Sequence, residues 1–244
     1  AYRQLQPGTM LHADELMNER RINQELHDQG FYTADGAIYF MDNGVPTLAL
    51  TREAHNPVLQ NIDAAFEQLI NEHNYPVSQA DFKQTLAAPD TTLIALPELR
   101  LSAGNQEYGY LPIGTAPAKY KKLNVEERKF AERVFGQDRD FVKKMEMLKN
   151  AKIGETRIYV LNPDYVRQHA EKGAVARASW LYDFVNGSAF GADDRYINSH
   201  NRVRGVRASE ASKEAQEMCL PNTFLRRKLI GFSFLAPAGR GAQN

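Results

Sequence analysis

The feature that most constrains the fold is an Asn-Gly dipeptide between two strand-like runs, in GAIYFMDNGVPTLALTRE at residues 36–53. Asn and Gly tolerate the positive φ angles that a two-residue turn between antiparallel strands requires. Both flanking runs contain the β-branched and aromatic residues that are typical of strands. The segment therefore predicts a β-hairpin, and any fold for this chain contains an antiparallel pair of strands.

Helices are indicated by apolar residues three and four positions apart and by the residues that cap them. Asn56 stands at an N-cap position with Pro57 at the first helical position. Ser78 and Asn124 stand at two further N-cap positions, and Gly136 ends the second of these helices. The expected helices cover residues 11–29, 56–74, 78–88, 124–136, 140–154 and 163–173.

Strands beyond the hairpin are indicated by short runs rich in Val, Ile, Leu and Tyr. They are expected at residues 91–101, 108–114, 156–162, 174–180, 202–209 and 229–235. Helices dominate the first two thirds of the chain and strands the last third, with no internal repeat. This order predicts the α+β fold class.

The charge balance limits the class of partner. Thirty basic and thirty acidic residues cancel, which argues against a nucleic-acid partner because binding to phosphates needs an excess of Lys and Arg.

No apolar run reaches the roughly 18 residues of a transmembrane segment. The first residues, AYRQLQPG, lack the charged and apolar regions of a secretion signal. The single Cys219 excludes an intramolecular disulfide and a multi-cysteine metal site.

Motifs of catalysis and cofactor binding are absent from the sequence. It contains no HExxH, CxxC, GxSxG, Walker loop or GxGxxG. None of its six histidines stands at a metal-ligand spacing from another. Asp193 and Asp194 in GADDRY lack the further oxygen ligands and the terminal Glu of a calcium-binding loop. We therefore expect neither an enzyme nor a bound cofactor or metal.

One segment has an unusual composition: LYDFVNGSAFGADDRYINSHNRVRGVR, residues 181–207, contains no Lys, Glu, Gln, Met or Trp. Those five types account for 49 of the 244 residues, so a random window of this length would lack them roughly once in 400 cases. Tyr, Ser, Gly and Asn are abundant in it, as they are in the binding loops of antibodies. Its aromatic residues argue against disorder. The composition therefore favours a binding surface over a plain connection.

The strand ARASW, the mixed stretch after it and the closing RVRGVR resemble the variable region of diversity-generating retroelement proteins. That resemblance implies a C-type-lectin-like fold. In that family an error-prone reverse transcriptase randomises the adenines of AAC and AAT codons, and the resulting codons never encode Lys, Glu, Gln, Met or Trp. These are the five types missing from residues 181–207. WLYDFVNGS followed by RVRGVR also resembles the end of a family of secreted lectin-like modules.

The helical pattern at residues 11–29, the late strand at 229–235 and the implied fold together predict an N-terminal helical segment over residues 1–30 and a C-type-lectin-like domain over residues 31–244, whose first and last strands pair. Within it, residues 180–202 form a variable ligand-binding segment, and the protein is a receptor-type binder of an unknown protein or surface ligand. No randomised codon of this kind encodes Trp, so if Trp180 contacts the ligand, the resemblance makes it a fixed contact. The expected ligand-binding residues are Trp180, Tyr182, Asp183, Val185, Asn186, Ala189, Gly191, Asp193, Asp194, Tyr196, Asn198, Ser199 and Asn201.

The randomised positions among these are expected to be exposed on one face, held by the strands on either side. Tyr182 and Tyr196 are the expected anchors because aromatic residues dominate the energetics of interfaces. Phe184, Phe190 and Ile197 are expected to point inward, since their apolar side chains favour burial.

Three other functions remain open at this point. A secreted or surface lectin-like module would bind carbohydrate, although the Glu-Pro-Asn, Gln-Pro-Asp and Trp-Asn-Asp signatures of sugar-binding lectins are absent. A formylglycine-generating oxidase-like enzyme would need two active-site thiols, and the chain has one cysteine. A purely structural surface or virion protein would show no variation at residues 181–202 between neighbouring genomes.

Overall fold

The expected hairpin is present in the computed structural model as β2 (Gly36–Asp42) and β3 (Val45–Thr51), which pair antiparallel along their whole length. Asn43 and Gly44 form the turn with φ of 48° and 84°, the left-handed conformation that Asn and Gly tolerate best. The hairpin prediction is confirmed. The structure describes residues 10–62, 64–65, 68–69, 74–184, 187, 189–194, 202–203, 205–207 and 228–230.

The helices form largely where their caps predict them. Asn124 accepts a hydrogen bond from the backbone N–H of Glu127 at 2.8 Å, and the Glu127 carboxylate accepts one from the Asn124 N–H at 2.9 Å. Ser78 Oγ accepts from the Asp81 N–H at 3.1 Å. The helices are α1 (Ala13–Ile22), α2 (Pro57–Gln60), α4 (Gln79–Ala87), α5 (Pro117–Tyr120), α6 (Val125–Phe135), α7 (Asp138–Asn150) and α8 (Pro163–His169).

Several expected elements end earlier than predicted, and the helices expected at residues 140–154 and 163–173 end at Asn150 and His169. The helix expected at residues 11–29 ends at Ile22, because Asn23 takes an extended conformation and its side chain caps a separate short turn at Gln24–Leu26. The strand expected at residues 91–101 ends at Ala95, where a 3-10 turn containing a proline begins. Part of the helix expected at 56–74 lies outside the described residues.

One curled sheet organises the described part of the chain, with its central strands in the order β5-β3-β2-β9-β10-β8-β7-β6. β10 lies between β9, to which it is antiparallel, and β8, to which it is parallel. The remaining strands are β1 (Phe31–Tyr32), β4 (Tyr75–Pro76), β5 (Thr92–Ala95), β6 (Ser102–Ala103), β7 (Tyr108–Gly114), β8 (Glu155–Leu161), β9 (Val175–Leu181), β10 (Phe190–Asp194), β11 (Arg202–Val203), β12 (Gly205–Arg207) and β13 (Lys228–Ile230).

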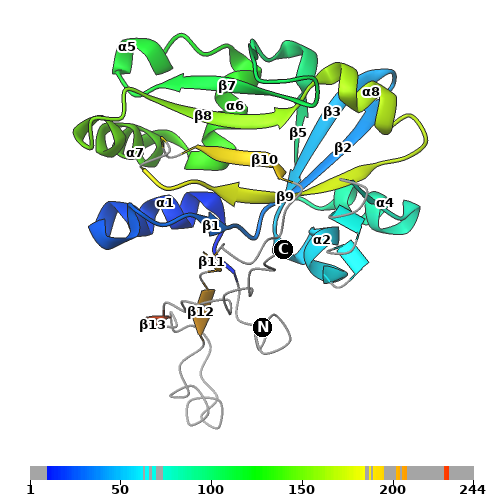
Figure 1. Ribbon diagram of the computed structural model, residues 1–244, viewed down its shortest axis with the longest axis horizontal. Helices are drawn as coiled ribbons and strands as arrows, with labels where there is room; N and C mark the ends of the chain where they lie inside the picture. Colours follow the sequence, from blue (N-terminus) through cyan, green and yellow to red (C-terminus); the bar gives the residue numbers. More distant parts are fainter. Residues whose placement is uncertain are drawn as a thin grey trace, which may run out of the picture.

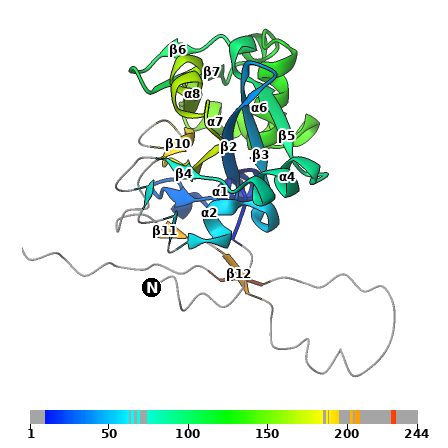
Figure 2. The same ribbon diagram turned by 90° about the vertical axis from the view of Figure 1, so that its right-hand side faces the viewer.

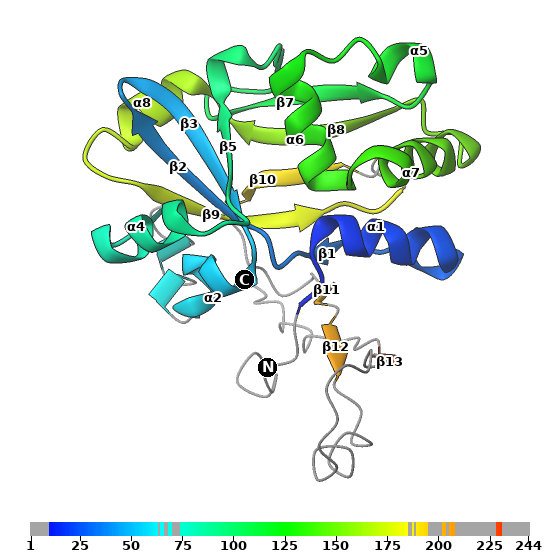
Figure 3. The ribbon, with the colours of Figure 1, turned by 180° about the vertical axis from the view of Figure 1, so that it is seen from behind.

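The two faces of the sheet are covered differently. α6 and α7 lie over β7 and β8 on the face seen in Figure 3, whereas no described helix lies over β7, β8 and β10 on the face seen in Figure 1. Side chains alternate between the faces, as strand geometry requires. On β7 and β8, the inner positions Leu111, Ile113, Ile158 and Val160 are at most 1% exposed and join the larger core cluster.

The N-terminal helix belongs to this same core. Leu16 and Met17 on α1 are at most 1% exposed and pack in one cluster with Phe130 of α6 and Phe141 of α7. A second cluster on the other face of β2 and β9 contains Ile38, Phe40, Tyr32 and Trp180, with α2 and α4 nearby in Figures 1 and 2. α1 therefore completes the core beneath the sheet.

The last strands pair differently from the expectation. β1 pairs antiparallel with β9 and parallel with β11, so both of its hydrogen-bonding edges are occupied. β13 pairs with β12 in a separate two-stranded sheet, and Figures 1 and 2 show β12 apart from the main sheet. The predicted pairing of the first strand with the last is therefore wrong for the described residues. The single strand expected at 202–209 is divided between these two sheets.

Candidate functional site

The residues expected to bind a ligand lie at the end of the central strand β9 and after it. Trp180 lies near its end, and Tyr182 and Asp183 come directly after it. Ala189 immediately precedes β10, which returns antiparallel beside β9 and carries the remaining described positions of the set. These are Gly191, Asp193 and Asp194. The other members of the set, Val185, Asn186, Tyr196, Asn198, Ser199 and Asn201, lie outside the described residues, as does Ile197.

Backbone hydrogen bonds hold the connection between β9 and β10. The Tyr182 N–H donates to the Ala189 carbonyl at 2.7 Å, which closes the connection at its base. The Phe184 N–H donates to the carbonyl of His27 at 2.7 Å, and the Gly187 N–H donates to the Phe184 carbonyl at 3.1 Å. The segment is therefore tied to its own base and to the turn that follows α1.

The Phe184 side chain anchors this connection. Its ring stacks on His27 with centroids 4.1 Å apart, and the Arg20 guanidinium lies 5.3 Å from its centre. Phe184 is half-buried and packs against the larger core, while Phe190 on β10 is fully buried. Both therefore point inward as predicted.

Asp183 interacts electrostatically with the scaffold. Arg20 on α1 is 1% exposed, and burial lowers its pKa to about 9, while the negative charge of Asp183 acts in the opposite direction. Arg20 also donates through Nη2 to the Gln29 carbonyl. Asp183 thus helps to stabilise a buried cation, a role that its place in the sequence did not indicate.

Three of the expected contacts have little accessible surface. Trp180 is 8% exposed, Ala189 is 2% exposed and Gly191 is buried. The expectation that Ala189 and Gly191 are exposed is wrong: Gly191 lies between Trp180 and Tyr159 in the sheet, and the Tyr182 ring contacts both of these neighbours. Trp180 lies so close to Gly30 that a side chain at that glycine would collide with the indole.

Aromatic rings cross the sheet beside this segment. We call Tyr32, Trp180, Tyr182, Tyr159 and Tyr110 the aromatic strip. Successive ring centroids are 4.8, 6.2, 6.0 and 5.6 Å apart in that order. The first two residues are buried, whereas the last three are half-buried. The strip therefore runs from the covered part of the sheet to its open face.

Strand register produces this alignment. Tyr32 lies opposite Trp180, and Tyr159 lies opposite Tyr110. Gly191 lies opposite Trp180 on one side and Tyr159 on the other, so the row has no ring on β10 itself. Tyr182 contacts the aromatic rings on both sides of this glycine. Five strands thus contribute to one continuous row of positions.

Tyr110, Tyr159 and the neighbouring Arg157 were not identified from the sequence as site residues. Their strands were expected, and the alternation in YGYLPIG and TRIYVLN was the available signal, because it places Tyr108 with Tyr110 and Arg157 with Tyr159 on one face of each strand. Arg157 lies 4.7 Å above the Tyr110 ring and pairs with Glu155 at 3.2 Å. Hydrogen bonds with Tyr159 and Glu155 raise the pKa of Arg157.

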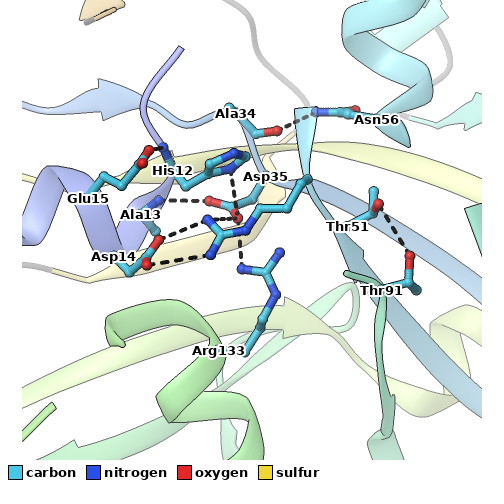
Figure 4. A network of polar contacts seen from close by, with 11 residues as sticks. His12, Ala13, Asp14, Glu15, Ala34, Asp35, Thr51, Asn56, Thr91 and Arg133 are labelled. Carbon is cyan, nitrogen blue, oxygen red and sulfur yellow. Dashed lines mark hydrogen bonds and ion pairs between the residues drawn. The ribbon is translucent and has the colours of Figure 1, made fainter. Parts of the chain in front are cut away.

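A buried polar network lies between α1, the turn that follows β1, and α6 (Figure 4). Asp35, in the turn between β1 and β2, accepts hydrogen bonds from the Ala13 N–H at 2.8 Å and from Arg133 Nη1 at 3.0 Å. The His12 Nδ1 lies 3.3 Å from the same carboxylate. Burial raises the pKa of Asp35, but His12 and Arg133 lower it more, so the pKa lies well below the usual range. The network joins α1, the turn and α6.

Neither a metal-binding cluster nor a membrane-spanning helix is found among the described residues. In this part of the chain, no group of three or more His, Cys, Asp or Glu side chains is placed to hold a metal ion. Over the same residues, every helix is too short or too polar to span a bilayer.

Comparison with known proteins supports the fold. No family model matches the chain, and no curated protein matches it. A solved structure from Nanoarchaeota, described as accommodating massive sequence variation by the C-type lectin fold, is similar with a TM-score of 0.52. The match covers 76% of this chain and 81% of that chain at 13% sequence identity. This chain has a C-type lectin fold. Within this C-type lectin fold, the candidate site lies where β9 and β10 meet the open face of β7 and β8.

Proposed function

We propose that this protein is a receptor-type binder that displays a diversified surface on its C-type lectin fold and is the product of a diversity-generating retroelement. The observation that carries the proposal is the absence of Lys, Glu, Gln, Met and Trp from residues 181–207. Adenine-directed variation of AAC and AAT codons produces that absence, whereas the needs of a turn do not. The expected partner is a protein or other surface ligand.

Two structural facts support the proposal. The Nanoarchaeota protein with the same fold accommodates massive sequence variation, and a fold that tolerates variation is what such a receptor needs. In this chain, the β9–β10 connection is held by backbone hydrogen bonds from Tyr182, Phe184 and Gly187, which form with almost any side chain at the varied positions. The scaffold can therefore hold one backbone path for many sequences.

The contacts with ligand are expected to come from the accessible positions of the segment. Tyr182 is half-buried at the edge of the open face and has the aromatic surface that interfaces use. Ala189 and Gly191 are too buried to supply much contact area, so they affect binding mainly by setting the shape of β10.

The decisive test is genomic. We expect a reverse-transcriptase gene beside the gene for this protein, together with a second copy of the segment rich in AAC and AAT codons. Chains from closely related genomes should differ at residues 181–202 and agree at residues 140–161, which serve as the internal control. Identical sequences over 181–202, with no such gene nearby, would contradict the proposal.

We further propose that the protein binds without enzymatic activity and without a cofactor. Calorimetry with Ca²⁺ and a glycan array separates this from the lectin alternative. We expect no calcium-dependent glycan binding, and tight binding of that kind would favour a carbohydrate-binding module instead.

A further inference from the structure

Part of the open face lies outside the segment whose composition is unusual. Tyr110 and Tyr159 stand on β7 and β8, yet their rings continue the row that Tyr182 begins. We propose that Tyr110, Tyr159 and Arg157 form a fixed subsite for a polypeptide segment that carries arginine side chains. This inference rests on the proposed function, in which residues 181–202 supply the variable part of the same face.

The subsite is continuous with the variable segment. The Tyr182 and Tyr159 ring centroids are 6.0 Å apart, and those of Tyr159 and Tyr110 are 5.6 Å apart. These are contact distances for aromatic pairs. A ligand held by residues around Tyr182 therefore extends directly onto Tyr159 and Tyr110, because no described helix covers this face.

The chemistry of these rings favours a cation. The face of an aromatic ring carries a negative electrostatic potential, which attracts a guanidinium group. Within the protein, Arg157 already lies 4.7 Å above the centre of Tyr110, so this face accepts a guanidinium in the folded chain. Glu155 pairs with Arg157 at 3.2 Å and offsets its charge. Arg157 thus occupies the face of Tyr110, and an arriving arginine competes with it for that ring, while the pairing of Arg157 with Glu155 reduces the repulsion between the two guanidinium groups.

The dimensions and residue types favour a polypeptide over a single small ligand. The half-buried part of the strip runs from Tyr182 through Tyr159 to Tyr110 over successive centroid distances of 6.0 and 5.6 Å, which equals the length of about three to four extended residues. The strip consists of Tyr and Trp residues, and Arg157 lies beside it. These three residue types dominate the hot spots of protein interfaces. The fixed subsite would supply a general affinity for arginine, and the variable segment would select among such partners.

The test uses the whole chain with carbon-13 in its tyrosine rings and the peptide acetyl-GRGRGRG-amide as the probe. We expect the ring signals of Tyr110 and Tyr159 to shift with the arginine peptide and to stay in place with acetyl-GQGQGQG-amide. Replacing both residues, as Tyr110→Leu with Tyr159→Leu, should weaken binding by about tenfold, or about 1.4 kcal/mol. Leu keeps an apolar surface but lacks the aromatic ring face.

Controls separate the ring effect from damage to the fold. The variant with both Tyr110→Phe and Tyr159→Phe keeps the rings and should bind nearly as well as the wild type. Tyr75→Leu removes a half-buried tyrosine ring on β4, outside the strip, and serves as the matched control. Any of four outcomes would overturn the proposal: equal shifts with both peptides, shifts with maltohexaose instead, no shift at all, or unchanged affinity in the Leu variant.

If the genomes vary at 181–202 but the peptide does not bind, only the subsite fails. If the peptide binds but the segment does not vary, the receptor proposal fails.

Discussion

At the scale of the residue, Phe184 ties the connection between β9 and β10 to the scaffold. Its ring stacks on His27 and lies under the Arg20 guanidinium, so Phe184→Ala removes contacts to two parts of the scaffold at once. We expect a loss of about 2 kcal/mol in the free energy of unfolding, below the usual cost of a fully buried Phe because this ring is half-buried. Urea unfolding measures it, with Leu86→Ala, an exposed position, as the control. Equal stability of the two variants would contradict the anchoring role.

Asp35 is the second residue whose effect can be predicted. Its folded-state pKa is depressed, so its contribution to stability is present above the unfolded pKa of about 4 and is lost as pH falls from there through the folded pKa. Asp35→Asn should cost about 3 kcal/mol at neutral pH, because the buried Arg133 loses its anionic partner. The difference from the wild type should narrow as urea unfolding is repeated below pH 4. Asp164→Asn, at a surface pair, should show no such pH dependence, and a constant gap for Asp35→Asn would refute the assignment.

At the scale of the element, the packing of β10 and of the residue before it limits variation at these positions. Ala189 and Ala192 are at most 2% exposed, so a larger side chain there has no space to occupy. We expect Ala189→Phe to lower the free energy of unfolding by about 2 kcal/mol through overpacking. Tyr182→Ala, at a half-buried position, should cost about 1 kcal/mol. Thermal unfolding compares the two variants, and the reverse order would place the accessible surface at Ala189 instead of Tyr182.

At the scale of the whole molecule, α1 and the sheet depend on one another. Leu16 and Met17 belong to the core cluster that also contains the inner residues of β7 and β8. Leu16→Ala should therefore cost about 3 kcal/mol and lower the midpoint for the entire chain. The single tryptophan, Trp180, lies in the other cluster, so its fluorescence and the far-ultraviolet circular dichroism should report one common transition. Two separate transitions would show that the N-terminal helix folds independently of the sheet.

Local chemistry in the sequence was sufficient for many elements. Asn43 and Gly44 specify a turn by their tolerance of positive φ, and Asn124 specifies a helix start by accepting an N–H that otherwise has no partner. These interactions involve residues within a few positions, so they can be inferred without the fold. The inward orientation of Phe190 follows from the same local reasoning about apolar side chains.

The composition of residues 181–207 likewise led to a resemblance whose implied C-type lectin fold the structure shares. Register and strand order could not be obtained in this way, because they are set by contacts between residues far apart in the chain. The tertiary structure alone aligns Tyr110 with Tyr159 and places Gly191 between Trp180 and Tyr159. The tertiary structure also buries Ala189, which lies next to β10. Burial depends on which segments become neighbours in the fold, and the local sequence of one strand does not specify those neighbours.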